Sequence, residues 1–190
     1  MPISFDLEEL RKTHNCVNYF ETGLWDPRNP NVSSRLVVSC GFDKIYCIEI
    51  RKDWVELGNE VFKDYIATGK YNLYLDDSAN MKKYLVTDNF KNKTMFFLDA
   101  HVDNNNIHNY NKRCPLFFEL EAIKSLERKD NVILIDDLRI IKNAFPWGEE
   151  SYGNIDFLQQ IKETILTINK DYKFSTLNGH INDDVLIAYV

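Results

Sequence analysis

Carboxylates follow two apolar runs of the sequence, at positions where a buried strand would end. Asp99 follows the run MFFL, and Asp136 and Asp137 follow the run VILI. If these runs are neighbouring parallel strands, three carboxylates converge and repel one another unless they are protonated or neutralised by a cation. Carboxylate oxygens suit Mg²⁺ better than zinc. The pattern therefore predicts a Mg²⁺ site made of Asp99, Asp136 and Asp137.

His101 lies two residues beyond Asp99, beside this predicted cluster. The ordinary pKa of histidine suits proton abstraction near neutral pH, so His101 is a candidate general base. A single histidine is also a common structural residue, and that alternative stays open.

The ends of three earlier apolar runs carry acids as well, so that all five expected parallel strands end in acid. This recurrence argues against ordinary solvated surface charge, which belongs mainly to helix faces and outer loops. The loops that follow parallel strands hold the ligands of open α/β sheets. The candidate residues at these three ends are Glu21, Thr22, Gly23, Glu49, Asp76, Asp77 and Ser78.

Each of these acids also has a purely structural explanation. Glu21 could be a turn carboxylate, although Gly23 behind it would let the backbone approach a ligand. Glu49 could cap the following helix, or accept hydrogen bonds from both hydroxyls of a ribose. Asp77 with Ser78 could cap a helix, contact a ligand, or do both.

Short apolar runs alternate with longer amphipathic stretches along the chain, which is typical of an α/β protein with a mostly parallel sheet. Only the turn NGHINDD separates the last two runs, so they should form an antiparallel hairpin. We expect strands at 16–21, 44–49, 71–75, 94–99, 131–136, 172–177 and 184–190, and helices at 31–41, 51–69 and 114–129.

Composition narrows the class of protein. With 190 residues, 44% of them hydrophobic, the sequence predicts one domain over 1–190 with a sizeable core. A net charge of −6 argues against a nucleic-acid partner. The four cysteines show no metal-ligand spacing, and no apolar run approaches the ~18 residues of a membrane span. We therefore expect a soluble, cytoplasmic protein with reduced thiols and no membrane partner.

The order of the motifs YFETG, YCIEI, YLDDS, FFLDAH and ILIDDLR, followed by a terminal hairpin, resembles class I S-adenosylmethionine-dependent methyltransferases. Within them, LDAH with IDD is similar to the metal-dependent sugar O-methyltransferases of the macrocin O-methyltransferase type. The resemblance implies a Rossmann-like sandwich with a seven-stranded, mostly parallel sheet. It implies transfer of a methyl group to a sugar hydroxyl of a small molecule, glycan or glycoconjugate, and it is compatible with a homodimer.

The resemblance also assigns roles to residues. S-adenosylmethionine would be bound by the strand-end residues already named, from Glu21 to Ser78, together with Asp99. Mg²⁺ would be held by Asp99, Asp136 and Asp137. The family's base is an acidic residue where this chain has His101, so the base here would be His101 or Asp103. The first loop, ETGLWDPRNPN, has one glycine where the superfamily usually has several.

Three alternatives remain from the sequence. A Mg²⁺-dependent phosphohydrolase or a nucleotide-sugar transferase could also use clustered aspartates at strand ends. No Asp-x-Asp follows the first strand and no GxxxxGK[ST] motif is present, which counts against the hydrolase. A methyltransferase-like scaffold that binds a partner without catalysis is the third alternative.

Overall fold

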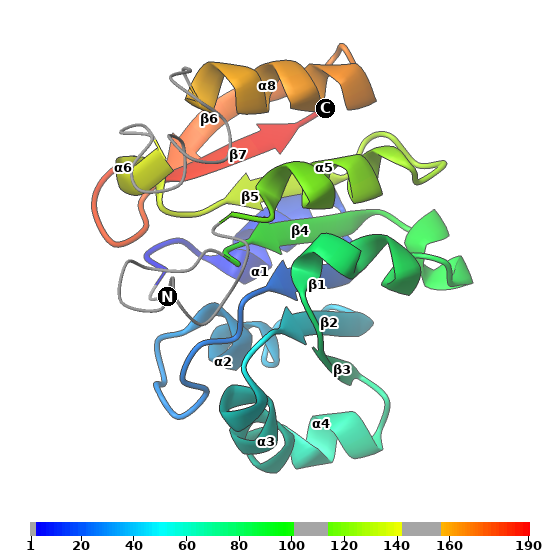
Figure 1. The fold of residues 1–190 in the computed structure, drawn as a ribbon, viewed down its shortest axis with the longest axis vertical. Helices are drawn as coiled ribbons and strands as arrows, with labels where there is room; N and C mark the ends of the chain where they lie inside the picture. The colour runs from blue at the N-terminus through cyan, green and yellow to red at the C-terminus, as the bar shows by residue number, and fades with distance from the viewer. Residues whose placement is uncertain (1–2, 101–113, 142–156) are drawn as a thin grey trace.

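Seven strands form a single sheet in the order β3-β2-β1-β4-β5-β7-β6 (Figure 1). This computed structural model describes residues 3–100, 114–141 and 157–190. The strands are β1 Asn18–Thr22, β2 Lys44–Glu49, β3 Tyr71–Leu75, β4 Thr94–Leu98, β5 Val132–Ile135, β6 Lys173–Leu177 and β7 Val185–Tyr189.

Six of these seven strands run in one direction, and β7 runs in the opposite direction. β1 pairs with β2 and β4, β2 pairs with β3, and β4 pairs with β5, all in parallel register. β7 runs antiparallel to both β5 and β6. The predicted Rossmann-like methyltransferase sheet with an antiparallel C-terminal hairpin is therefore confirmed.

Helices cover both faces of the sheet. The helix α5 packs on the 3-10 helix η1 and on α8, and these elements form one layer, while α1 lies behind the sheet in Figure 1. The helical elements are α1 Leu7–His14, α2 Ser33–Val37, α3 Lys52–Val61, α4 Lys63–Ala67, η1 Ser78–Tyr84, η2 Asp88–Lys91, α5 Leu116–Lys124, α6 Leu138–Ile141 and α8 Phe157–Ile168.

The central strands are apolar throughout because both of their faces are covered. In β4, Phe96 and Leu98 belong to the hydrophobic cluster under α5 and α8, whereas Met95 and Phe97 belong to the cluster on the opposite face. Successive side chains of a strand point to opposite faces, so a doubly covered strand reads as an unbroken apolar run. Their parallel carboxyl ends consequently share one edge of the sheet.

The helices differ from the sequence prediction more than the strands do. The helix expected over 51–69 is broken at Phe62, whose φ of −103° and ψ of 13° lie outside helical values. The side chain of Phe62 is fully buried and stacks on Tyr71, with ring centroids 4.5 Å apart. Tertiary packing thus overrides the local helical pattern. The helix expected over 31–41 is reduced to α2, and α1 was not predicted.

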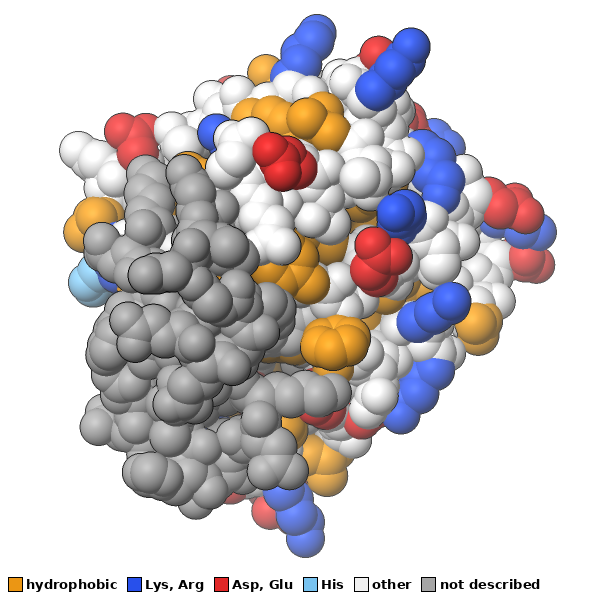
Figure 2. All heavy atoms as spheres, turned by 45° about the horizontal axis from the view of Figure 1, so that its top comes forward, with side chains coloured by type: hydrophobic (Ala, Val, Ile, Leu, Met, Phe, Trp, Pro, Cys, Tyr) orange, Lys and Arg blue, Asp and Glu red, His pale blue; other side chains and the backbone are white. Residues whose placement is uncertain are grey.

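The charged side chains on the surface and the length of the helices can be compared with the composition. On the face shown in Figure 2, Lys and Arg side chains lie interspersed with Asp and Glu, as the modest net charge implies. Within the described ranges, no helix combines the length and the apolar character needed to cross a membrane.

Removal of apolar volume from β5 should be costly. Ile133 is fully buried, so Ile133→Ala should lower the free energy of unfolding by about 2–5 kcal/mol, because lost burial and a residual cavity both contribute. Ile181→Ala is the size-matched control; this side chain is 51% exposed, and we expect a loss below about 1 kcal/mol. Urea unfolding of the two variants measures both values, and equal losses would contradict the assigned core.

Candidate functional site

The carboxyl edge of the parallel strands brings together most of the acids predicted from the sequence. Along this edge the chain reverses direction between β1 and β4, since β2 and β3 lie on one side of β1 and β4 and β5 on the other. Ligands of open α/β sheets bind at such a switch point. Backbone hydrogen bonds join the strand ends there. The amide of Gly23 donates to the carbonyl oxygen of Ile48, and the amide of Asp99 donates to the carbonyl oxygen of Thr22.

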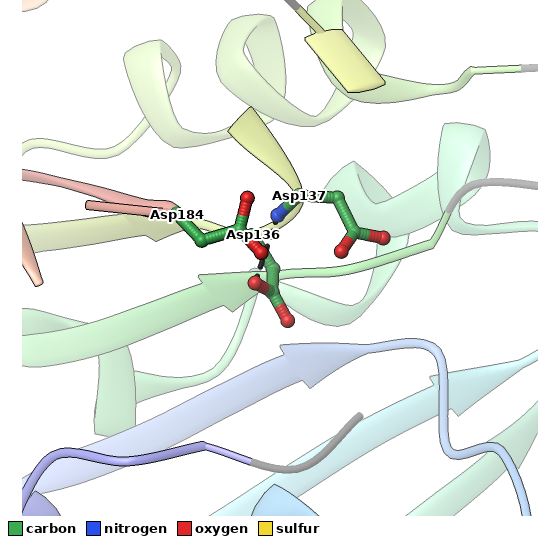
Figure 3. Close-up of side chains that lie close together, drawn as sticks. All are labelled: Asp136, Asp137 and Asp184. Atoms are coloured by element: carbon green, nitrogen blue, oxygen red, sulfur yellow. Dashed lines mark hydrogen bonds between the residues drawn. The ribbon is translucent and has the colours of Figure 1, made fainter. Parts of the chain in front are cut away.

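At one end of this edge lies a cluster of three buried aspartates, Asp136, Asp137 and Asp184 (Figure 3). Each offers one carboxylate oxygen, and these oxygens lie within 4.8 Å of one another. The amide of Asp137 donates to Oδ1 of Asp136 at 2.8 Å. Asp137 itself has a left-handed φ of 62°, which Asp tolerates better than most residues.

Asp184 is a member of this cluster that the sequence prediction missed. It directly precedes β7, and β7 is antiparallel to β5, with Leu186 opposite Ile135. The amino end of β7 therefore lies beside the carboxyl end of β5, and Asp136 is the first residue after β5. The sequence shows an acid before the last apolar run, but the predicted hairpin pairs that run with β6 and does not specify its pairing with β5.

Arg139, the second missed residue, is the basic side chain of the cluster. It is the second residue of α6, the helix that begins directly after the aspartate pair. Its Nη1 forms ion pairs with both Asp137 and Asp184, and its amide donates to Oδ1 of Asp184 at 2.9 Å. Two buried carboxylates thus share one guanidinium.

The electrostatics of Asp136 favour a cation at the cluster. Burial, with the nearby charges of Asp99 and Asp137, raises the pKa of Asp136 to about 8. Its Oδ2 is buried and has no hydrogen-bond partner among the residues that the structure describes. A buried carboxylate with an unused oxygen and acidic neighbours fits a hard divalent cation such as Mg²⁺. The predicted ligands Asp136 and Asp137 are brought together, and Asp99 lies close enough to act on Asp136.

Glu21 belongs to β1, and its side chain lies inside the protein. It is fully buried, and its carboxylate accepts hydrogen bonds from the hydroxyls of Tyr19, Ser33, Ser34 and Tyr71. These contacts join β1 to α2 and β3. In this arrangement Glu21 positions the segment after β1, while its predicted contact with a cofactor stays a prediction.

Gly23 and Glu49 shape the first loop. Gly23 has a φ of 86°, and a Cβ there would lie 2.7 Å from the carbonyl oxygen of Asp99, so only glycine fits between the ends of β1 and β4. Oε2 of Glu49 accepts from the amides of Leu24 and Trp25 at 2.8 and 3.3 Å. Its Oε1 accepts from the amide of Arg51 at 2.7 Å. Glu49 therefore ties the first loop to the end of β2.

Asp76, Asp77 and Ser78 follow β3. Asp77 caps η1 by accepting from the amide of Ala79 at 2.8 Å, which confirms the capping interpretation. Burial alone would raise the pKa of Asp76, but contacts from Lys83, Tyr84 and other donors lower it to about 2. Asp76 is therefore ionised near neutral pH. Ser78 is buried at the start of η1.

The two residues predicted as proton acceptors, His101 and Asp103, lie outside the described residues. Their role stays a prediction from the sequence.

The comparison with solved structures supports the architecture described above. No family model and no curated protein matches the sequence. Among solved structures, the chain is similar to the O-methyltransferase TomG from Streptomyces achromogenes, in complex with S-adenosylmethionine, with a TM-score of 0.57 and 14% identity over 97% of this chain and 77% of that one.

Two further solved structures show the same likeness. An O-methyltransferase from Bacillus cereus, in complex with S-adenosylhomocysteine, gives a TM-score of 0.57 and 16% identity over 97% of this chain and 78% of that one. The S-adenosylhomocysteine-bound methyltransferase PaMTH1 from Podospora anserina gives 0.54 and 14%, over 95% and 74%. The chain has the class I methyltransferase fold. At these identities the likeness establishes the fold and leaves cofactor and acceptor to be tested.

The buried carboxylate of Glu21 should make stability depend on pH. Burial raises the pKa of Glu21 above its ordinary value of 4.5, in spite of the hydrogen bonds from Ser34 and Ser33. The folded state then holds the proton to higher pH than the unfolded state, so the free energy of unfolding falls as pH rises from 4.5 through the raised pKa.

Glu21→Gln removes this titration. The stability of the variant relative to the wild type should therefore rise as the pH is raised from about 5 to about 8. Urea unfolding at the two pH values measures the change, and Glu60→Gln, an exposed site in α3, is the control. An identical pH dependence in wild type and Glu21→Gln would contradict the assignment.

Proposed function

We propose that this protein is an S-adenosylmethionine-dependent O-methyltransferase that uses a divalent cation, with Mg²⁺ the expected ion, and acts on a sugar hydroxyl. The observation that carries the proposal is the position of the acids in the methyltransferase sheet. Glu49 ends β2 on one side of the switch point, and the aspartate cluster lies at β5 and β7 on the other. Two chemically different subsites therefore share one edge.

The β1–β2 end is suited to the cofactor. Gly23 keeps the loop close to the ends of the neighbouring strands. Glu49 is only 6% exposed, and its Oε1 accepts one described hydrogen bond, which leaves acceptor capacity for a ribose hydroxyl. The three solved structures named above carry S-adenosylmethionine or S-adenosylhomocysteine.

The β5–β7 end is suited to the acceptor. S-adenosylmethionine supplies a methyl group that its sulfonium already activates, so the protein's main task is alignment of the attacking oxygen. Asp136, Asp137 and Asp184, with Asp99 nearby, would hold Mg²⁺, and a cation there would make vicinal sugar hydroxyls more acidic and fix their orientation. The sugar specificity rests on the resemblance of LDAH and IDD alone.

The first test concerns the cofactor. Calorimetric titration with S-adenosylhomocysteine should show binding, and Glu49→Ala should weaken it by about 1–3 kcal/mol, the scale of leaving polar groups unpaired. Glu60→Ala, an exposed glutamate of α3, should bind as the wild type does. Because Glu49 also holds the first loop, the melting temperature is recorded beside each titration. Absence of binding to the wild type would refute the methyltransferase proposal and favour a scaffold or a different enzyme.

The second test concerns the metal. After dialysis against EDTA, Mg²⁺ should bind the wild type, and Asp136→Asn should weaken binding about tenfold or more, since one charged ligand is lost. Asp43→Asn, an exposed aspartate before β2 at the opposite edge, is the charge-matched control.

The acceptor is then sought by transfer of labelled methyl from S-adenosylmethionine to a panel of sugars and glycans, with Mg²⁺ and with EDTA. Transfer that is equally fast in both would remove the metal from the proposal.

A further inference from the structure

We propose that Arg139 is a built-in counter-ion of the aspartate cluster, whose guanidinium competes with the divalent cation for Asp137 and Asp184. The inference rests on the metal site of the proposed function and adds a residue that sets its affinity. The competition concerns one nitrogen, Nη1, which contacts both carboxylates. A cation shared by these two carboxylates would need the same position.

The buried carboxylates of the cluster need a proton or a positive charge to offset their repulsion. Asp137 and Asp184 are both fully buried, and an isolated buried carboxylate is strongly destabilising. Of the described side chains, Arg139 is the basic group that forms ion pairs with them. It therefore supplies charge compensation in the protein without metal.

Arg139 holds the cluster in two separable ways. Its backbone amide donates to Oδ1 of Asp184, and the neighbouring amide of Leu138 donates to the carbonyl oxygen of Asp184 at 2.8 Å. These bonds come from backbone amides and do not involve the guanidinium. The guanidinium contacts are additional, so the side chain can leave while Asp184 stays beside Asp136 and Asp137.

The guanidinium of Arg139 also lies next to solvent. The Arg139 side chain is 24% exposed, whereas both of its carboxylate partners are at 0%. Rotation toward water would rehydrate a charge that is already partly solvated, while the carboxylates would exchange one cation for another. Asp136 offers a further buried oxygen, Oδ2, which the arginine does not satisfy. A divalent ion can therefore gain a ligand that the guanidinium does not use.

The test measures metal affinity directly. Arg139→Gln keeps the backbone bonds and removes the charge, so it should bind Mg²⁺ and Mn²⁺ roughly tenfold or more tightly than the wild type, since a neighbouring charge shifts an ionic equilibrium by about one to three powers of ten. Without metal it should melt at a lower temperature than the wild type, and added Mg²⁺ should raise its melting temperature more. Calorimetry and thermal unfolding of the EDTA-treated proteins provide both readouts.

Two variants control for charge and position. Arg139→Lys keeps a cation at the site and should retain near wild-type affinity. Arg128→Gln removes an equal charge before β5, at the opposite edge, where Arg128 pairs with Asp130, and should leave metal affinity unchanged. Equal affinity in Arg139→Gln and wild type would overturn the inference, as would the absence of metal binding in both.

A measurement on the wild type keeps the inference testable if Arg139→Gln does not fold. The Nε–H resonance of Arg139, assigned through its loss in Arg139→Lys, should shift when Mg²⁺ is added, and that of Arg128 should not. An unmoved Arg139 resonance at saturating Mg²⁺ would overturn the inference. Titration with S-adenosylhomocysteine separates this result from the proposed function, because cofactor binding at the β1–β2 end does not depend on Arg139.

Discussion

The burial of carboxylates at one edge of the sheet is the constraint on which the rest of the site depends. Each buried acid must find donors or a counter-charge, and the protein supplies them differently from strand to strand. Glu21 receives hydroxyls, Glu49 receives backbone amides, and Asp137 and Asp184 receive a guanidinium. The loops after the strands are shaped by these bonds, and not by the strands alone.

Sheet topology explains why the acids gather at all. Parallel strands place their carboxyl ends together, so acids far apart in the sequence become neighbours. The antiparallel β7 contributes its amino end to the same edge, and with it Asp184. The reversed strand at the end of the chain thus completes a cluster begun by the parallel strands, which a last strand in the same direction as the others would not do.

The strands and their acidic ends could be predicted from the sequence because a doubly covered strand leaves an unbroken apolar run, and acid marks its end. All seven predicted strands are present. Asp184 and Arg139 escaped because their role depends on pairing between β5 and β7, which residue order alone does not specify. Phe62 breaks a predicted helix because its ring is buried against Tyr71, a contact that no local pattern records.

The internal position of Glu21 is a further feature that the sequence alone does not specify. An acid at a strand end can point either toward the ligand edge or into a helix layer, and the donors decide which. Here Ser33 and Ser34 of α2 and Tyr71 of β3 surround its carboxylate. These donors are neutral hydroxyls from other elements of the fold, so the described contacts hold Glu21 in the interior without a counter-ion.

The two ends of the edge therefore differ in kind. At β1 and β2, neutral donors of the protein bind Glu21 and Glu49, and the bonds to Glu49 already hold the first loop. At β5 and β7, Asp136 keeps an oxygen that no described group satisfies, and its neighbours depend on a charged partner. Neutral hydrogen bonds fix geometry without regard to ions in solution, whereas a site closed by ion pairs responds to them. The first end is thus suited to hold a cofactor in one place, and the second to exchange one cation for another.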